Sequence, residues 1–255
     1  MAENIQIRAG GGQYIQGLHA FPKERSYSNI DKLLVVMLHD FPGNKDGYEG
    51  LSRDLSVQIA DKGYHTFRFD YRGCGESDGR EEDFTLAGGS HDLQHVIRWA
   101  KSKGYERFIL ISEGLGAPVA LQAVPDQTLC MIMMWPMIDL PLIAKQAFNA
   151  DNIEQEWKKA GYMLINEHRV GMPFMKELKM TTLSGELKRL KKPLLIMHGS
   201  KDETSPISQL DLVRQHTNAR RVEITSFHDG TYGLPQENHR KTMAYHIMQF
   251  IEKYT

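Results

Sequence analysis

Short apolar runs alternate with amphipathic helical patterns along the chain, and this alternation limits the fold more than any other feature. The runs expected to form strands are residues 33–38, 65–70, 108–112, 130–134, 194–198 and 222–225. The helical patterns are residues 47–62, 90–103, 116–124 and 238–253. Strands separated by helices form mostly parallel sheets with helices on both faces. The sequence therefore predicts an α/β fold on a mostly parallel central sheet flanked by helices.

Length and charge narrow the class of protein. The chain has 255 residues, 41% of them hydrophobic, which is enough for one sizeable core. Its 31 Lys and Arg nearly cancel its 32 Asp and Glu, so a net charge of -1 gives no reason to expect nucleic acid as a partner. The two cysteines are too few for a disulfide framework.

The sequence also predicts where the protein resides. The N-terminus lacks the basic start and apolar run of a secretory signal. No apolar stretch approaches the roughly 20 residues that a membrane span needs. We therefore expect a cytoplasmic globular protein with no membrane span.

Residues 137–190 interrupt the alternation. They hold no strand-like run between two expected core strands and are rich in helix formers and methionine. Methionine-rich helical segments can repack around an apolar ligand. We therefore divide the chain into a core, residues 1–136 and 191–255, and a helical cap or lid insertion, residues 137–190. Ordinary helical packing beside the sheet is the alternative.

Four segments, each near the carboxyl end of an expected strand, resemble the α/β-hydrolase superfamily. They are LHDFPGN (38–44), FRFDYRGCGESDG (67–79), ILISEGLGAPVAL (109–121) and PLLIMHGSKDETSP (193–206). The chain most resembles compact lid-bearing esterases, such as feruloyl and cinnamoyl esterases and monoglyceride-lipase-like enzymes. The resemblance implies a serine nucleophile on a sharp strand-to-helix turn, a histidine base, an orienting carboxylate and two backbone donors for the oxyanion.

The nucleophile position of this pattern, G-x-S-x-G, falls on Gly114. Ser112 then takes the first glycine position and Gly116 the last. Glycine adopts the required positive φ without the strain of about 1–3 kcal/mol that another residue would have there. It provides no side-chain nucleophile. This is what a chain that keeps the fold but not the reaction would show, and an inactivated variant of an enzyme would show it too.

The resemblance implies one residue for the acid position of the triad and leaves two registers open for the base position. The acid position is Asp202, in the loop after residues 194–198, with helix capping as the alternative role. The base position lies in SFHDGTYGL, where we favour the register that places Tyr232 on the histidine. A shortened loop would bring His228 into the site instead, and His228 is otherwise an exposed loop residue.

The oxyanion loop reads HDFPG where the family has HGFxG. The expected donors are the backbone N–H groups of Phe41 and Leu115. Asp40 replaces the usual glycine, and its carboxylate would oppose a developing negative charge if it pointed inward. We expect His39 to brace this loop by hydrogen bonding.

Other residues are weaker candidates for a replacement nucleophile or base. Ser112 lies two residues before the turn, and Glu113, a conceivable base for water, occupies a position that usually packs away from the pocket. Cys74 is expected to be a structural thiol. No cluster of His, Cys, Asp or Glu has metal-ligand spacing, and no glycine run matches a phosphate-binding loop or dinucleotide fingerprint. We therefore expect no metal or cofactor.

Three functions fit these expectations. The first is a non-catalytic or repurposed hydrolase that binds a small acyl, ester or aromatic molecule under the cap, since loss of a triad nucleophile can reduce turnover by about 10⁶. The second is an active esterase or thioesterase with a displaced nucleophile, or a lyase-like activity that needs only the pocket. The third is docking of a protein partner on the cap or pocket mouth. Neither ligand identity nor oligomeric state has a sequence signature.

Overall fold

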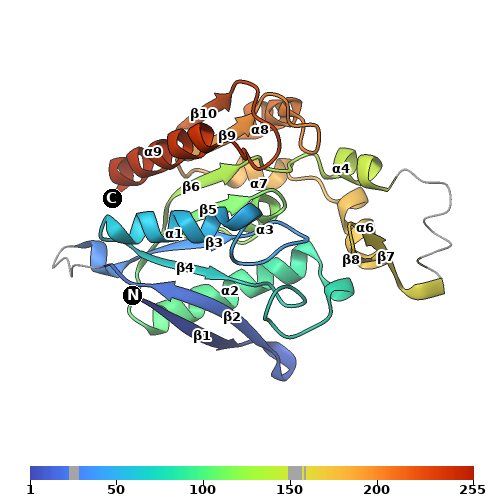
Figure 1. Ribbon diagram of the computed structural model, residues 1–255, viewed down its shortest axis with the longest axis horizontal. Coiled ribbons are helices and arrows are strands. Elements are labelled where there is room, and N and C mark those ends of the chain that lie inside the picture. The colour runs from blue at the N-terminus through green and yellow to red at the C-terminus, as the bar shows by residue number, and fades with distance from the viewer. Residues whose placement is uncertain (23–28, 149–156, 158) are drawn as a thin grey trace.

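A central sheet organises the molecule. The computed structural model describes residues 1–22, 29–148, 157 and 159–255, and within them eight strands form one sheet in the order β1-β2-β4-β3-β5-β6-β9-β10 (Figure 1). From β4 to β10 all neighbouring strands are parallel. At the other edge, β1 pairs antiparallel with β2, and β2 pairs antiparallel with β4. The strands are β1 Ala2–Arg8, β2 Tyr14–Ala20, β3 Leu33–Leu38, β4 His65–Phe69, β5 Arg107–Glu113, β6 Thr128–Met134, β9 Leu194–Gly199 and β10 Val222–Phe227. The expected α/β fold is confirmed.

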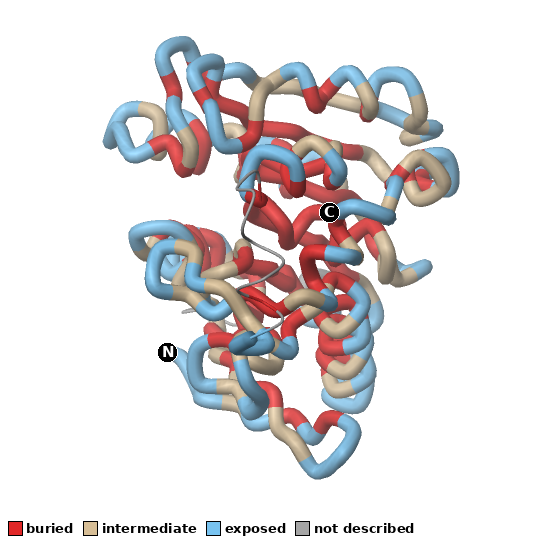
Figure 2. The backbone as a smooth tube through the Cα atoms, turned by 90° about the vertical axis from the view of Figure 1, so that its right-hand side faces the viewer, coloured by how far each residue is buried: buried red, intermediate tan, exposed pale blue. Residues whose placement is uncertain are grey.

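Alternate residues of the strands separate two apolar layers. On β3, Leu34 and Val36 join one buried cluster, and Leu33 and Val35 join the other. The first cluster packs under α2 (Leu86–Ser102), α3 (Gly116–Gln122), α7 (Ser184–Arg189) and α8 (Leu210–His216). The second packs under α1 (Leu51–Asp61) and α9 (Glu237–Tyr254). Figure 2 shows the result, with buried strands inside and helices exposed on their outer sides.

The sequence patterns missed the β1–β2 hairpin at the edge of the sheet. Its strands pair from Ala2 with Ala20 to Arg8 with Tyr14. Polar residues are frequent in both strands, so neither presents the continuous apolar run that indicates a buried strand. Gly11 and Gly12 form the turn with φ of 71° and 80°.

Local backbone geometry also shifts the start of α1. A helix was expected from residue 47, but α1 begins at Leu51. Gly47 and Gly50 both have positive φ, 75° and 78°, which a right-handed helix does not accommodate. Residues Tyr48–Gly50 therefore form only a short 3-10 turn.

The described part of residues 137–190, the expected cap insertion, contains helices and a small hairpin. Its described elements are α4 (Leu140–Ala147), β7 (Tyr162–Ile165), β8 (His168–Gly171), α6 (Met172–Met180) and α7. The two-stranded β7–β8 sheet was not expected from the sequence. Asn166 and Glu167 both have positive φ in its turn, as in the tight hairpin turns whose twist suits antiparallel strands. In Figure 1 the hairpin and α6 project from the carboxyl end of the central sheet.

Candidate active site

Two loops meet at the carboxyl end of the sheet. Because β3 and β5 are parallel neighbours, with Leu38 paired to Ser112, the segments that follow them emerge side by side. The segment after β5 turns at Gly114, which has φ of 47° and leads into α3. The segment after β3 carries Asp40. Strand pairing thus brings together Gly114, the expected nucleophile position, and the loop that was expected to hold the oxyanion.

The Asp40 carboxylate occupies the place expected for the oxyanion. Its Oδ1 accepts hydrogen bonds from the backbone N–H groups of Phe41 and Leu115, both at 2.7 Å. These are the two donors that the sequence pattern assigns to the oxyanion. The Tyr232 hydroxyl donates to Oδ2 of the same carboxylate. The donors converge as in a hydrolase, but on a side chain of the protein itself.

Gly114 provides the space for that carboxylate. A Cβ atom at position 114 would lie 2.4 Å from Cγ and Oδ2 of Asp40, well inside any real contact distance. Serine at this position therefore cannot coexist with Asp40 in its present place. The aspartate and the glycine are sterically coupled.

The enclosed position of Asp40 alters its protonation. Part of the residue reaches the surface, yet burial of the carboxyl group is the largest effect and raises its pKa to about 7. Hydrogen bonds from Leu115 and Phe41 oppose this, whereas the nearby carboxylates of Glu113 and Asp202 add to it. Near neutral pH the group exists in both protonation states.

His39 holds the loop from beneath. Its Nε2 accepts from the backbone N–H of Tyr71 at 3.2 Å, and its Nδ1 lies 2.6 Å from the backbone oxygen of Asp40. A neutral imidazole protonated on Nδ1 satisfies both contacts. Burial lowers the pKa of His39 to about 4, which keeps the ring neutral. His39 thus links this loop to the residue after Asp70.

The loop after β10 places Tyr232, and not His228, against Asp40. The Tyr232 ring packs near Trp135, with centroids 5.9 Å apart, and near Tyr48, 5.5 Å apart. His228 is 92% exposed and pairs with its neighbour Asp229 at 2.8 Å. No histidine of this loop approaches the Asp40 carboxylate.

Asp202 follows β9 and is buried. Its Oδ1 accepts from the backbone N–H groups of Thr204 at 3.0 Å and Ser205 at 2.8 Å. Its Oδ2 has no hydrogen-bond partner within the described part of the chain. Burial raises the pKa of Asp202 to about 6. A histidine base would bond to such a free oxygen in a triad, but the nearest imidazole contact is His198 Nε2 at 3.8 Å.

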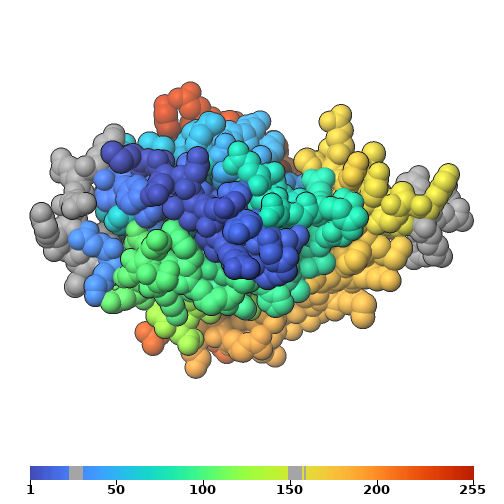
Figure 3. Space-filling model, turned by 90° about the horizontal axis from the view of Figure 1, so that it is seen from below, coloured from blue at the N-terminus to red at the C-terminus, as the bar shows by residue number. Residues whose placement is uncertain are grey.

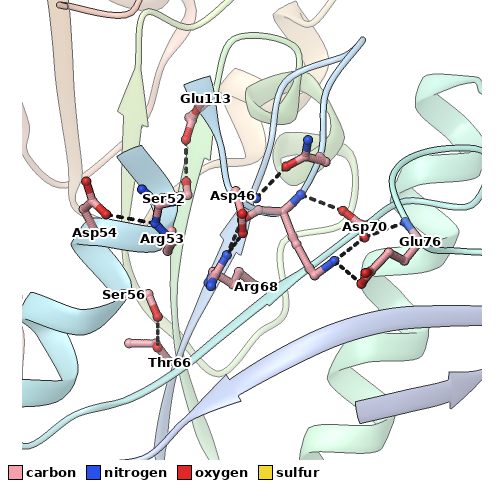
Figure 4. A network of polar contacts seen from close by, with 12 residues as sticks. Asp46, Ser52, Arg53, Asp54, Ser56, Thr66, Arg68, Asp70, Glu76 and Glu113 are labelled. Atoms are coloured by element: carbon pink, nitrogen blue, oxygen red, sulfur yellow. Dashed lines mark hydrogen bonds and ion pairs between the residues drawn. The ribbon is translucent and has the colours of Figure 1, made fainter. Parts of the chain in front are cut away.

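The remaining candidates face away from the bend. Ser112 lies within the sheet, 1% exposed, and its hydroxyl is 3.4 Å from the Ile132 backbone oxygen. Glu113 accepts from the Ser52 hydroxyl of α1 (Figure 4). It also accepts from the Tyr48 N–H at 2.9 Å, so the first turn of α1 and the loop before it hold this carboxylate. Cys74 is buried, and its thiol pKa is raised well above the usual value by that burial, which disfavours the reactive thiolate.

A buried ion pair, which the sequence reasoning missed, anchors the segment that follows Asp40. Asp70 is fully buried and accepts from the Lys45 backbone N–H at 2.6 Å and from Lys45 Nζ at 2.8 Å (Figure 4). Lys45 also contacts Glu76 at 2.6 Å. The segment FRFDYRGCGES, noted only for its resemblance, contains both acidic partners. These contacts hold in place the loop after β3, which carries Asp40.

Aromatic side chains cover the loop from the insertion side. Phe41 stacks on Phe84 with centroids 4.1 Å apart, and Phe174 of α6 meets Phe41 edge-on at 4.9 Å. Phe41 and Phe174 are 4% and 3% exposed. The insertion therefore packs directly on the residue that donates one of the two N–H groups.

No three side chains of His, Cys, Asp or Glu in the described ranges gather closely enough to hold a metal ion. Among the same residues, no helix has the length and apolar character to cross a bilayer.

Solved structures support the fold. The complex of ferulic acid with Est1E from Butyrivibrio proteoclasticus superposes with a TM-score of 0.83 at 18% identity, covering 98% of both chains. Mouse alpha/beta hydrolase domain-containing protein 10 gives 0.78 at 17% identity, covering 99% of this chain and 100% of that one. These neighbours confirm the expected α/β-hydrolase fold.

Curated relatives are more informative about family. An acyl transferase of Vibrio campbellii is 31% identical over 128 residues, which is 50% of this chain and 40% of that protein. Lysophosphatidylserine lipase ABHD12 of Rattus norvegicus is 29% identical over 181 residues, 68% of this chain and 42% of that protein. The match thus spans about two fifths of these relatives' lengths. The acyl transferase family model matches residues 3–171, more than half of the chain, so this protein belongs to the acyl transferase family.

Proposed function

We propose that this chain does not transfer acyl groups through a nucleophile at the bend, and that it binds a small acyl, ester or aromatic molecule instead. One observation carries the proposal: the Asp40 carboxylate takes both backbone donors, Phe41 and Leu115, that an oxyanion would need. Gly114 leaves the bend without a nucleophilic side chain. The missing nucleophile and the occupied donors both oppose the same step, formation of the tetrahedral oxyanion.

The energetic consequence is large. Each oxyanion donor commonly stabilises the transition state by about 2.7–4 kcal/mol. Donors already bonded to a carboxylate cannot provide this, and an ionised Asp40 would also repel a developing negative charge. A tetrahedral oxyanion at this place is therefore disfavoured unless Asp40 leaves.

The proposed ligand class follows from the relatives and from the lining of the loop. The names of the relatives concern acyl transfer and a lysophospholipid, and one structural neighbour, Est1E, is solved with ferulic acid bound. In this chain the aromatic residues Phe41, Phe84 and Phe174 could pack against an acyl or aromatic group. Because Phe41 and Phe174 are buried, residues 137–190 would have to move, as a cap does, to admit it.

A second function is favoured by one further observation. A carboxyl group with a pKa of about 7, bonded to the Tyr232 hydroxyl, has the protonation behaviour that general acid–base catalysis requires. Asp40 would then transfer a proton to or from a substrate, in an activity that needs no nucleophile at position 114.

The purified chain distinguishes the two functions. It would be incubated with p-nitrophenyl acetate and butyrate and with a fluorophosphonate probe, and its binding of methyl butyrate and methyl ferulate would be measured by calorimetry. The non-catalytic proposal expects binding of at least one ester, no turnover above buffer and no labelled serine. Turnover that follows an ionisation near pH 7 and disappears in Asp40→Asn would establish the acid–base function in its place. A fluorophosphonate-labelled serine would contradict both.

A further inference from the structure

A large open groove lies at the amino ends of the parallel strands, at the end of the sheet opposite Asp40. Its volume is about 1250 Å³. The second half of α2, residues 121–129 leading into β6, the end of α7 and the segments before β9 and β10 line it. Figure 3 shows part of this region, where the green surface of α2 borders the orange surface around α7. The groove therefore joins segments that are far apart in sequence.

The lining of the groove is strongly basic. Seven of its residues are Lys or Arg and two are Asp or Glu. The chain as a whole has a net charge of -1. Positive charge is thus concentrated here, in a protein that has no overall excess of it. Such local fields attract partners of opposite charge.

Four of these cations are unpaired. No carboxylate of the described residues lies within ion-pair distance of them, and all four are exposed: Arg98, Lys101, Lys191 and Arg220. The other three are already engaged. Arg189 pairs with Glu186 at 2.8 Å, Arg221 pairs with Glu223 at 2.7 Å, and Lys192 donates to the Asp126 backbone oxygen at 2.7 Å. The unpaired cations belong to three separate segments, so an extended anionic partner could contact them together.

Between the cations the lining combines aliphatic side chains with the amides of Gln94, Gln122 and Gln127. The aliphatic and proline residues include Ile97, Leu121, Val124, Leu129, Leu190 and Pro193. Tyr254 is the one aromatic residue in the lining. Thr128, 2% exposed, also belongs to it, and its hydroxyl has no hydrogen-bond partner within the described ranges. A buried hydroxyl without a partner is unfavourable, and a bound polar group could satisfy it.

We propose that this groove binds an acidic amphipathic helix of a partner protein. Apolar side chains of such a helix would pack on the aliphatic floor, and its carboxylates would face the unpaired cations. Three turns of a helix about 10 Å wide occupy roughly 1,300 Å³, comparable to the groove. Small-molecule pockets are usually smaller, about 300–1,000 Å³, and more enclosed.

Nucleic acid fits the same lining less well. Single strands bind through bases stacked on several aromatic side chains, and the groove has one aromatic residue. Duplexes are held by phosphate contacts that gain nothing from an aliphatic floor. The combination of charge and apolar surface therefore favours a protein helix. Docking here would leave the Asp40 region, at the other end of the sheet, uncovered.

The full chain would be tested by fluorescence anisotropy with a labelled helical peptide of about 18 residues, with Glu on one face and Leu on the other. A scrambled peptide of the same composition and a short duplex DNA are the comparison ligands. The test variants are the double substitutions Lys101→Glu/Lys191→Glu and Lys101→Gln/Lys191→Gln. A matched control, Lys62→Glu/Lys179→Glu, reverses two exposed lysines outside the groove. Circular dichroism would confirm that each variant is folded.

We expect the amphipathic peptide to bind more tightly than either comparison ligand, with an affinity that falls as salt rises. Charge reversal in the groove should weaken it by at least about tenfold, charge removal by less, and the control by less than about twofold. Absence of binding, equal binding of the scrambled peptide, or equal loss in the control variant would overturn the proposal. Tighter binding of duplex DNA would assign the groove to nucleic acid instead.

Discussion

At the scale of single residues, Asp40 and Gly114 depend on each other, because the Asp40 carboxylate fits only beside a residue without a side chain. The carboxylate occupies the space in which a side chain at position 114 would begin, 2.4 Å from the ideal Cβ position. A glycine is also the residue that adopts the positive φ of this bend most easily. Restoring a serine alone therefore creates a clash rather than a nucleophile.

The first prediction concerns restoration of the triad. Gly114→Ser alone should destabilise the fold by about 1–3 kcal/mol, through overpacking and positive-φ strain. Asp40→Gly combined with Gly114→Ser removes the clash, and the further change Tyr232→His introduces a histidine at the expected base position. We expect esterase activity above buffer in the triple variant, measured with p-nitrophenyl butyrate. The matched double variant, which retains Asp40, should remain inactive; equal activity in both would show that Asp40 does not block the site.

The second prediction concerns the protonation of Asp40. A carboxyl group whose pKa rises from 3.8 unfolded to about 7 folded binds more protons in the folded state between these values. Its contribution to stability is therefore full below pH 4 and is lost as pH rises through 7. The free energy of unfolding of Asp40→Asn, relative to the unaltered chain, should increase by about 2–4 kcal/mol from pH 4 to pH 8. Urea unfolding at both pH values measures this, and a difference independent of pH would contradict it.

At the scale of elements, the loop after β3 is fixed by partners from other segments. Asp70 directly follows β4 and binds both the backbone and the side chain of Lys45, and His39 binds the residue after Asp70. The loop therefore has little freedom to remove Asp40 from its donors. The aromatic contact of Phe174 with Phe41 adds a restraint from the insertion.

The third prediction follows from this anchor. Lys45→Met leaves the fully buried Asp70 carboxylate without its cation, and breaking such a pair typically costs about 3–5 kcal/mol. Lys32→Met removes a lysine from an exposed pair with Glu106, where the cost should be about 0–1 kcal/mol. Thermal and urea unfolding of both variants would compare them. Similar losses would mean that the Lys45 pair does not anchor the fold.

The insertion is attached to the core at one further point. Glu177 of α6 accepts from the backbone N–H groups of Leu86 and Ala87, the latter at 2.9 Å, at the start of α2. A carboxylate at a helix N-terminus satisfies unpaired donors and interacts favourably with the helix dipole.

The fourth prediction tests this attachment. Glu177→Ala should destabilise the chain by about 1–2 kcal/mol and speed limited proteolysis within residues 137–190. Glu186→Ala, which removes a surface carboxylate of α7, is the control and should leave the cleavage rate unchanged. Equal cleavage of both variants would show that Glu177 does not hold the insertion.

At the scale of the whole molecule, buried histidines make the fold sensitive to acid. His19 lies in a cluster with His65 and Tyr105, whose hydroxyl is 2.9 Å from a nitrogen of each ring. Burial lowers the pKa of His19 to about 4, and His39 is similarly neutral. The unfolded chain would protonate both near pH 6.5.

The fifth prediction concerns acid stability. Histidines with folded pKa values near 4 stabilise the fold above pH 6.5, and this contribution is lost as pH falls from 6.5 to 4. His19→Gln should reduce the dependence by up to about 3 kcal/mol. An exposed control, His228→Gln, should not change it. Denaturant titrations at pH 4.5 and pH 7 give the change in unfolding free energy between these pH values for the unaltered chain and for both variants. The same change in all three proteins would refute this account.

Much of the architecture was determined by the sequence itself. Continuous apolar runs, such as residues 33–38, require burial on both faces, so the parallel strands and the glycine at the bend could be predicted from local pattern alone. The edge hairpin β1–β2 escaped this reasoning because its strands are partly exposed and mix polar with apolar residues. The β7–β8 hairpin escaped it because strands of four residues present too short a pattern.

Only the tertiary structure decided what fills the oxyanion position. The resemblance implied that Asp40 replaces a glycine, but it did not give the direction of the carboxylate. That direction depends on contacts with Tyr232 and with Leu115 in the loop after β5, 75 positions away in the sequence. The basic groove likewise combines cations from segments that local pattern treats as unrelated. Periodicity records which residues must be buried, whereas a site depends on which distant loops the parallel pairing of strands brings together.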